Sequence, residues 1–288
     1  MKFALHFANF AFPEPERARE VAQVAERVGF ESMFCIEHVV IPTQYESIYP
    51  YGPDGRFPGG PSVVLPDPLV WMSYVAGVTA RIRFMTGVMI LPQRNPLVLA
   101  KEVATLDYLS GGRVELGIGV GWLKEEFDAL GVPFAGRGQR TDEHVAAMRA
   151  LWAGDDASFK GEHVNFEGMS CNPKPAQDSV PIIVGGHSRA AAKRAGRLGD
   201  GYFPAIGREV DLPTLFAIAR QSAAEHDRDP DALDFTAGCP GVFGDDPLGA
   251  IEERRDIGVA RIAVPGMQFI EDPERGLETF AEEVMVRA

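Results

Sequence analysis

The sequence predicts an α/β protein folded as a (β/α)8 TIM barrel, with insertions at the C-terminal face of the barrel. Two observations lead to this prediction. Short apolar runs alternate with amphipathic helical stretches along almost the whole chain, and each kind of segment occurs eight times. Strands that alternate with helices form a parallel sheet, and eight such units are the number that closes into a barrel. An open, doubly wound sheet is the alternative arrangement.

The predicted strands are short and apolar, and a helical pattern follows each of them. The strands cover residues 3–7, 32–36, 83–90, 113–117, 181–184, 201–203, 234–237 and 261–264. The helices cover residues 14–28, 68–79, 96–109, 139–153, 188–198, 212–228, 247–257 and 273–286. The 288 residues, of which 45% are hydrophobic, suffice for one barrel with modest insertions. We therefore expect a single domain over residues 1–288.

Three stretches interrupt this alternation. Residues 42–67 are rich in Pro, Gly and Tyr and show no periodicity. Because they follow the second strand, a barrel places them over its C-terminal face, where long irregular loops form lids or binding walls. Their three tyrosines and Phe57 favour packing over a ligand or a partner subunit; a surface excursion without a binding role is the alternative. Residues 122–138 form a second insertion, and residues 155–177 have the pattern of a short β excursion.

Charge and cysteine content exclude several classes of function. The formal net charge is −13, whereas a surface that binds nucleic acid needs clustered Lys and Arg, and the same charge disfavours an anionic membrane surface. No apolar run approaches the roughly 20 residues of a membrane span, and the apolar N-terminus lacks the cleavage site of a signal peptide. Three cysteines without a disulfide or zinc spacing indicate a reducing, cytoplasmic location.

His38 is the candidate catalytic residue. It follows the apolar run SMFCI and Glu37, and in a parallel barrel the C-terminal ends of the strands point into the active-site mouth. A histidine exchanges protons near neutral pH. Glu37 could orient it, although adjacent strand residues face opposite sides. The alternative is a histidine with a structural role at the edge of the core.

Glycines alternate along the end of the fourth strand, at Gly117, Gly119 and Gly121. Alternating glycines remove side chains from one face, which suits a flat ring lying against the backbone. The spacing resembles a dinucleotide-binding motif, but Trp122 takes the place of its third glycine and no matching acidic residue closes a second strand. Tight packing at a barrel corner is the alternative.

A second glycine-rich turn follows the fifth strand, where Gly185, Gly186 and His187 lead to Ser188, a candidate helix N-cap. Exposed backbone N–H groups and the partial positive charge of a helix N-terminus together form an anion site. Arg189 lies in the first turn of that helix, beside such an anion. An ordinary helix cap is the alternative.

The segment after the third strand has both structural and functional interpretations. Asn95 is a good N-cap with Pro96 at the first helical position, whereas Gly87 and Val88 could form a bulge behind a ring. The sequence contains no G-x-S-x-G, Walker or H-E-x-x-H motif and no close His/Asp cluster, so we expect no metal site.

Taken together, these segments resemble the luciferase-like monooxygenase superfamily, and within it the oxidoreductases that use the deazaflavin coenzyme F420. The resemblance covers about positions 36–204 and runs through IEHVVIPTQYESIYPYGPDGRFP, RIRFMTGVMILPQRNPLVLAKEVATLDYLSGGRVELGIGVGWLKEEFDALGVPFAGRGQRTDEH and PIIVGGHSRAAAKRAGRLGDGYFP. It implies a bacterial luciferase-like barrel, commonly a homodimer, with a ring cofactor across the barrel mouth and its phosphate at the turn after the fifth strand.

The resemblance also implies roles for individual residues. His38 matches the histidine near the reactive ring, and Gly87 with Val88 matches a strand bulge, often a non-proline cis peptide, that supports the ring. The other matches are the ring-lining glycines of the fourth strand and the phosphate turn. The full set of candidate cofactor-binding residues is Glu37, Gly87, Val88, Gly117, Gly119, Gly121, Gly185, Gly186, His187, Ser188 and Arg189.

The resemblance departs from the superfamily's sugar-phosphate dehydrogenases at one position. In those enzymes a glutamate follows the glycine run, whereas Trp122 stands there in this chain. We therefore expect an apolar or aromatic substrate rather than glucose 6-phosphate. The candidate substrate-binding residues are Tyr45, Tyr49, Phe57 and Trp122.

The predicted reaction is hydride transfer between reduced F420 and a small organic substrate, such as an activated alkene, an imine or a carbonyl, with proton transfer or hydrogen bonding by His38. Three alternatives remain open: a monooxygenase that uses FMN to activate oxygen, a non-catalytic flavin-binding protein, and a cofactor-free barrel lyase or isomerase. The predicted partners are the small-molecule substrate and a second copy of the chain.

Overall fold

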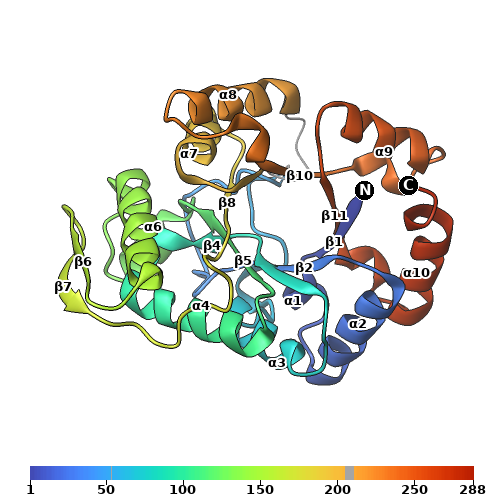
Figure 1. Ribbon diagram of the computed structural model, residues 1–288. Coiled ribbons are helices and arrows are strands. Elements are labelled where there is room, and N and C mark those ends of the chain that lie inside the picture. The colour runs from blue at the N-terminus through green and yellow to red at the C-terminus, as the bar shows by residue number, and fades with distance from the viewer. Residues whose placement is uncertain (53, 205–210) are drawn as a thin grey trace.

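The computed structural model describes residues 1–52, 54–204 and 211–288, and within them eight parallel strands close into a barrel (Figure 1). In sheet order these strands are β3 (Arg83–Thr86), β2 (Ser32–Cys35), β1 (Lys2–His6), β11 (Arg261–Pro265), β10 (Asp234–Gly238), β9 (Gly201–Phe203), β8 (Ile182–Gly185) and β5 (Val114–Gly119). Strand β3 also pairs with β5, which closes the ring. The predicted (β/α)8 barrel is confirmed, and the open sheet is excluded.

Eight helices surround the strands: α2 (Pro15–Val28), α3 (Pro68–Ala76), α4 (Pro96–Ser110), α6 (Arg137–Ala153), α7 (Arg189–Leu198), α8 (Leu212–Ala224), α9 (Pro247–Asp256) and α10 (Pro273–Phe280). Short helices α1 (Ala8–Ala11) and α5 (Lys124–Ala129) follow β1 and β5. Several helices begin at a side-chain cap with proline in the first turn, as at Asn95, whose side chain accepts hydrogen bonds from two backbone N–H groups. The predicted helix over 273–286 is helical to Phe280 and continues as a π-helical turn over Ala281–Met285.

The predicted third strand is divided in two. Strand β3 ends at Thr86, and β4 (Met89–Ile90) resumes the pairing with β5. Between them the Gly87–Val88 peptide bond is cis, as the family resemblance implies. The Gly87 N–H donates to the carbonyl of Cys35 at 2.6 Å, so the bulge stays attached to β2.

The insertions lie on two sides of the barrel. Residues 42–67 follow β2 and residues 122–138 follow β5, so both lie at the C-terminal face as expected. The third insertion forms an antiparallel hairpin of β6 (Ala157–Lys160) and β7 (Asn165–Met169), which projects beside α6 (Figure 1). Because this hairpin joins α6 to β8, it belongs to the N-terminal side, and it confirms the short β excursion predicted for residues 155–177.

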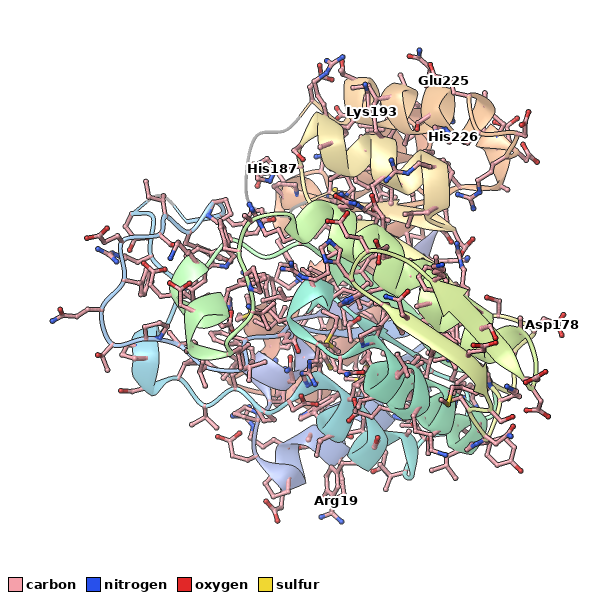
Figure 2. The ribbon with its side chains drawn as sticks, turned by 90° about the vertical axis from the view of Figure 1, so that its left-hand side faces the viewer. Arg19, Asp178, His187, Lys193, Glu225 and His226 are labelled. Carbon is pink, nitrogen blue, oxygen red and sulfur yellow. The ribbon has the colours of Figure 1, made fainter. Side chains whose placement is uncertain are left out.

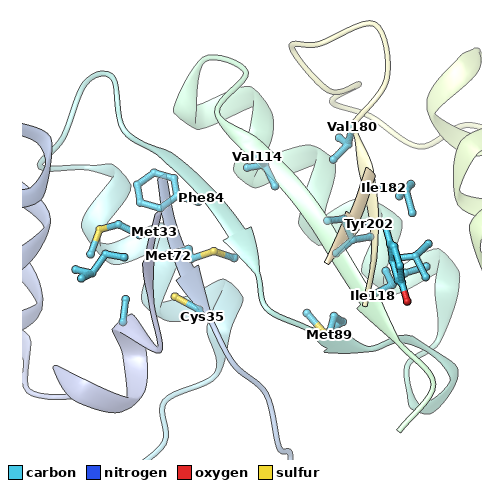
Figure 3. Close-up of a cluster of buried hydrophobic side chains, with 14 of the residues drawn as sticks. Met33, Cys35, Met72, Phe84, Met89, Val114, Ile118, Val180, Ile182 and Tyr202 are labelled. Atoms are coloured by element: carbon cyan, nitrogen blue, oxygen red, sulfur yellow. The ribbon is translucent and has the colours of Figure 1, made fainter. Parts of the chain in front are cut away.

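The barrel interior is filled in layers. Its apolar layer is made of Ala4, Phe34, Met85, Ile183, Phe203 and Ala263. At the N-terminal ends of the strands, Glu115 pairs with Arg83 and Arg261 in a buried ionic cluster. A larger apolar cluster fills the space between strands and helices, where Met33 of β2 and Met72 of α3 lie (Figure 3). In the part of the chain described, no helix has the length and apolar character needed to cross a membrane.

Candidate functional site

A cavity of about 530 Å³ opens at the C-terminal ends of the barrel strands. Strands β1, β5, β8 and β9, the segment after β2, the bulge after β3 and the beginnings of α6 and α7 all contribute to its lining. The sequence-predicted residues that line it are Glu37, His38, Tyr49, Phe57, Gly87, Val88, Gly119, Gly121, Trp122, Gly185, Gly186, His187 and Ser188. Segments that lie far apart in the sequence therefore meet where the barrel prediction placed them.

Three predicted residues do not line this cavity. Gly117 lies within β5, where its carbonyl accepts a hydrogen bond from the Thr86 hydroxyl at 2.6 Å and a Cβ atom would lie 1.9 Å from the Thr86 carbonyl oxygen. Arg189 is exposed on the first turn of α7. Tyr45 lies in an adjoining hollow that shares Phe57 with the cavity. The cofactor contacts expected of Gly117 and Arg189 stay predictions: in the structure Gly117 packs within the strands, and the side chain of Arg189 is exposed.

The remaining glycines make room for the bulge. A Cβ atom at Gly119 would lie 2.7 Å from Val88, and one at Gly185 would lie 2.5 Å from the other methyl group of Val88. Both distances are too short for a side chain, so the two glycines let Val88 project between β5 and β8. Gly121, at φ +81°, is similarly crowded by Phe127. The flat wall of the cavity is therefore built from backbone and Val88 together.

His38 is held by two side chains that fix its tautomer. The indole N–H of Trp122 donates to Nε2 of His38 at 3.3 Å, so Nε2 carries the lone pair and Nδ1 carries the proton. Nδ1 then donates to a carboxylate oxygen of Glu126 at 2.9 Å. The His38 side chain is only 5% exposed and that of Glu126 is fully buried. The nitrogen of His38 that carries the lone pair, Nε2, therefore faces the edge of the Trp122 indole ring at the wall of the cavity.

Glu126 is the residue that sequence reasoning missed. Burial opposes ionisation of its carboxyl group, but hydrogen bonds from His38 and from the backbone N–H of Val39 outweigh that effect, so the pKa of Glu126 is lowered. The second carboxylate oxygen accepts that N–H at 2.6 Å. An ionised carboxylate against Nδ1 orients the imidazole and fixes its tautomer. The sequence placed Glu126 in an insertion without periodicity and gave no sign of its partner.

Glu37 does not orient His38. Its carboxylate accepts the Ile90 N–H at 2.5 Å and pairs with Arg94, which also binds Asp67. Adjacent strand residues face opposite sides, so the side chain of Glu37 is directed to the bulge. Burial raises the pKa of Glu37 although Arg94 opposes the shift. The suggestion that Glu37 orients His38 is therefore wrong. Glu37 instead binds the backbone just after the Gly87–Val88 bulge, and Glu126 is the carboxylate that orients His38.

Residues 42–67, hereafter the lid, pack an aromatic wall against the site. The ring of Trp122 lies 5.2 Å from that of Tyr49 and 5.8 Å from that of Tyr45, and Phe57 meets the His38 ring at 4.7 Å. The carboxylate of Glu125 accepts the backbone N–H groups of residues 46 and 47. The four predicted substrate residues therefore form one aromatic cluster, of which Phe57 and Trp122 contact the His38 ring.

The phosphate turn lies at the outer end of the cavity. Ser188 caps α7 by accepting the Ala191 N–H at 3.1 Å. The ring of His187, which stands before α7, meets Tyr51 of the lid at 5.4 Å (Figure 2). Two cationic side chains that the sequence did not single out, Arg137 and Arg194, also line the cavity. An anion at this turn would therefore find N–H groups, a helix N-terminus and two guanidinium groups nearby.

His6 forms the floor of the cavity. It is the last residue of β1 and shares a strand face with Ala4, a member of the interior layer. Its side chain is surrounded by the rings of Phe7, Phe34 and Phe203, and burial lowers the pKa of His6 to about 3. The imidazole is therefore neutral at physiological pH.

This burial predicts acid sensitivity. The folded pKa of about 3 lies below the unfolded value near 6.5, so stability is complete above pH 6.5 and falls as the pH is lowered toward 3. We expect His6 to contribute a loss of about 1.4 kcal/mol per pH unit in that interval. Urea unfolding between pH 7 and pH 4.5 measures the slope, and His6→Phe should reduce it by about one proton. An unchanged slope in the variant would contradict the assignment.

Comparisons with known proteins agree with this geometry. The family model described as luciferase-like monooxygenase matches residues 3–283. An uncharacterised protein of Mycobacterium tuberculosis is 32% identical, with 99% of this chain and 98% of that protein covered. The F420-dependent glucose-6-phosphate dehydrogenase of Kineococcus radiotolerans is 34% identical, with coverage of 90% and 73%. The F420-dependent tetrahydromethanopterin reductase of Methanopyrus kandleri superposes with a TM-score of 0.79 at 18% identity, with 99% of each chain covered.

Proposed function

The chain belongs to the luciferase-like monooxygenase family and is an oxidoreductase, and from that premise we propose that it transfers a hydride between reduced coenzyme F420 and a small organic substrate. The observation that carries the proposal is the cavity at the barrel mouth, where an oriented histidine faces an aromatic wall. The F420-dependent dehydrogenase of Kineococcus radiotolerans, at 34% identity, supports the choice of cofactor.

The residues of the cavity fit a flat ring with an anionic tail. Gly119 and Gly185 leave one wall without side chains of its own, and Val88 projects between them. The turn before α7, with Arg137 and Arg194, would hold a phosphate at the other end. When bound, F420 supplies the hydride chemistry. The chain supplies binding, orientation and exclusion of water.

His38 handles the proton in this proposal. Among the described residues, the one donor to its Nε2 lone pair is the indole N–H of Trp122 at 3.3 Å, so a substrate group that carries a proton can take the place of the indole as donor. Glu126 accepts the Nδ1 proton's hydrogen bond and so keeps the proton on Nδ1 and the lone pair on Nε2. The pair can therefore accept a proton at Nε2, or return one, beside the aromatic wall.

The wall indicates an apolar or aromatic substrate. Trp122 and Tyr49 form it together with Phe57, and no carboxylate stands at position 122. A substrate screen with cyclic enones, imines, aromatic ketones and glucose 6-phosphate tests the class. We expect turnover with the apolar compounds; turnover with charged sugars alone would overturn it.

Titration of the apo-protein with F420 and separately with FMN, followed by fluorescence, tests the cofactor. Tight F420 binding with weak FMN binding is expected. The reverse preference, with oxygen consumption, would favour the FMN-dependent monooxygenase. Tight binding without turnover of any acceptor would favour a flavin-binding protein. Binding of neither compound would overturn the proposed function.

We also propose that the protein is a homodimer, through the α3–α4 side of the barrel. Val70 and Tyr74 lie one helical turn apart on α3 and are 69% and 44% exposed, and Val98 of α4 is 56% exposed. Such apolar exposure indicates a surface that is covered by a partner. Light scattering should give twice the 31.3 kDa chain mass. Val70→Asp with Tyr74→Asp should halve it, whereas the exposed Val286→Asp should not; a monomeric wild type would contradict the proposal.

The proposed cytoplasmic location rests on cysteine chemistry. The three cysteines, all within the described residues, are free thiols. Proteins of oxidising compartments more commonly pair their cysteines.

A further inference from the structure

We propose that His6 is a specificity-determining residue that hydrogen-bonds an uncharged polar atom at the deepest part of the bound ligand. The inference rests on the proposed function, because it assumes that a planar ligand enters the cavity. It adds a contact at the floor of the barrel, on the opposite side of the site from the lid.

The position of His6 directs its ring to the ligand. The residue lines the cavity and stands directly above the apolar layer of the barrel, since it shares a strand face with Ala4. Gly87 packs closely against one edge of the imidazole: a Cβ atom there would lie 3.1 Å from Cε1 and 3.2 Å from Nδ1 of His6. Any larger residue at position 87 would therefore displace the ring from its place at the cavity floor.

The surroundings of His6 do not account for an imidazole. The ring meets Phe203 edge-on at 5.4 Å and Phe34 edge-on at 5.9 Å, and Phe7 at 3.7 Å. Its Nδ1 atom is buried and has no hydrogen-bond partner among the residues described. A buried, unpaired polar atom destabilises the folded state. A phenylalanine would pack in this aromatic shell without burying an unpaired polar atom. The presence of a histidine instead therefore indicates that its ring hydrogen-bonds a polar atom from outside the chain.

The chemistry of that partner follows from the charge of the ring. Burial keeps His6 neutral at physiological pH, so the ring offers one N–H donor and one lone pair and no charge. Carbonyl, amide and hydroxyl groups match it, whereas a phosphate would be drawn to Arg137 and Arg194 at the outer end. Two sources carry such groups: the pyrimidine-dione edge of a deazaflavin or flavin ring, and the carbonyl of an organic substrate.

The test compares three variants for stability and binding. His6→Phe removes both nitrogens, His6→Asn retains an amide near the Nδ1 position, and His6→Gln extends one toward Nε2. The melting temperature without ligand, the Kd values for F420 and FMN, and the KM for 2-cyclohexen-1-one are measured for each. As a matched control, His144→Phe replaces another buried histidine, which is bonded to the Leu91 carbonyl and does not line the cavity.

We expect His6→Phe to keep or raise the melting temperature while it weakens ligand binding about tenfold, which corresponds to about 1.4 kcal/mol. His6→Asn or His6→Gln should restore most of the affinity and thereby identify the nitrogen involved. A change in the Kd for F420 or FMN assigns the contact to the cofactor ring, and a change confined to KM assigns it to the substrate carbonyl. The control should lower the melting temperature and leave binding unchanged.

Two results would overturn the inference in different ways. If wild type binds a cofactor and His6→Phe lowers the melting temperature without changing any Kd or KM, His6 is a core residue and only this inference fails. If wild type binds neither F420 nor FMN, the proposed function is wrong, and the inference about His6, which rests on it, is wrong as well. Should His6→Phe not fold, the same comparison is made between His6→Leu and His6→Asn.

Discussion

Replacing His38 by alanine is expected to reduce turnover about 10²-fold or more while leaving the affinity for the cofactor nearly unchanged. The variant removes the Nε2 lone pair that faces Trp122 and leaves the carboxylate of Glu126 without its imidazole partner. Because the glycine wall and the phosphate turn do not include His38, the cavity should still accept the ring. Steady-state kinetics gives kcat, and a fluorescence titration gives the Kd for F420.

Two further variants separate chemistry from packing. Glu126→Gln keeps the shape of the side chain but removes its charge, so it should lower kcat less than His38→Ala does, because the imidazole keeps a hydrogen-bond partner at Nδ1 but loses the carboxylate that orients it. His163→Ala, at an exposed histidine of the β6–β7 hairpin loop, is the control and should leave turnover unchanged. Equal turnover of wild type and His38→Ala would refute the role of His38.

Replacing Glu115 by alanine is expected to lower the free energy of unfolding by about 3–5 kcal/mol. Two carboxylate–guanidinium contacts, at 2.7 and 3.0 Å, join Glu115 to Arg261, and Arg83 adds a third at 3.0 Å. The side chain of Arg261 is only 2% exposed, so the variant leaves a guanidinium group buried beneath the apolar layer without its main counter-charge. Urea unfolding followed by circular dichroism measures the loss.

The matched control for this prediction is Glu274→Ala. Glu274 also pairs with an arginine, Arg27, at 2.8 Å, but both side chains are more than half exposed. An exposed pair contributes about 0–1 kcal/mol because water screens it. Equal losses in the free energy of unfolding for Glu115→Ala and Glu274→Ala would contradict the prediction that the buried ionic cluster contributes more to stability than an exposed ion pair.

The sequence predicts the barrel well because its strands are buried on both faces. Runs such as SMFC in β2 are short and apolar in three of four residues, and the structure buries all four. The same pattern identified His38, since its place after a strand decides where it points. Element ends were less well predicted: β5 continues to Gly119, two residues beyond the predicted end, because its last residues remain paired with β4 and β8.

The parts of the site that sequence reasoning missed depend on long-range contacts. His38 and Glu126 are 88 residues apart and meet only after β2 and α5 are brought to one barrel face. His6 was counted within an apolar strand, and nothing in that strand distinguishes a histidine at the cavity floor from one at the core edge. Gly117 matched the pattern of its neighbours, yet the space for its side chain is occupied by the backbone of β3.

The two neighbouring carboxylates at the beginning of α5 have a consequence for substitutions in the segments that they hold. Glu125 holds the lid through the N–H groups of residues 46 and 47, and Glu126 holds the segment after β2 through those of residues 39 and 40. Every residue except proline supplies such an N–H group. The side chains at these four positions can therefore be substituted without loss of the hydrogen bonds that Glu125 and Glu126 accept. Substitutions in the lid would therefore alter the aromatic wall of the cavity while the contact between His38 and Glu126 stays in place.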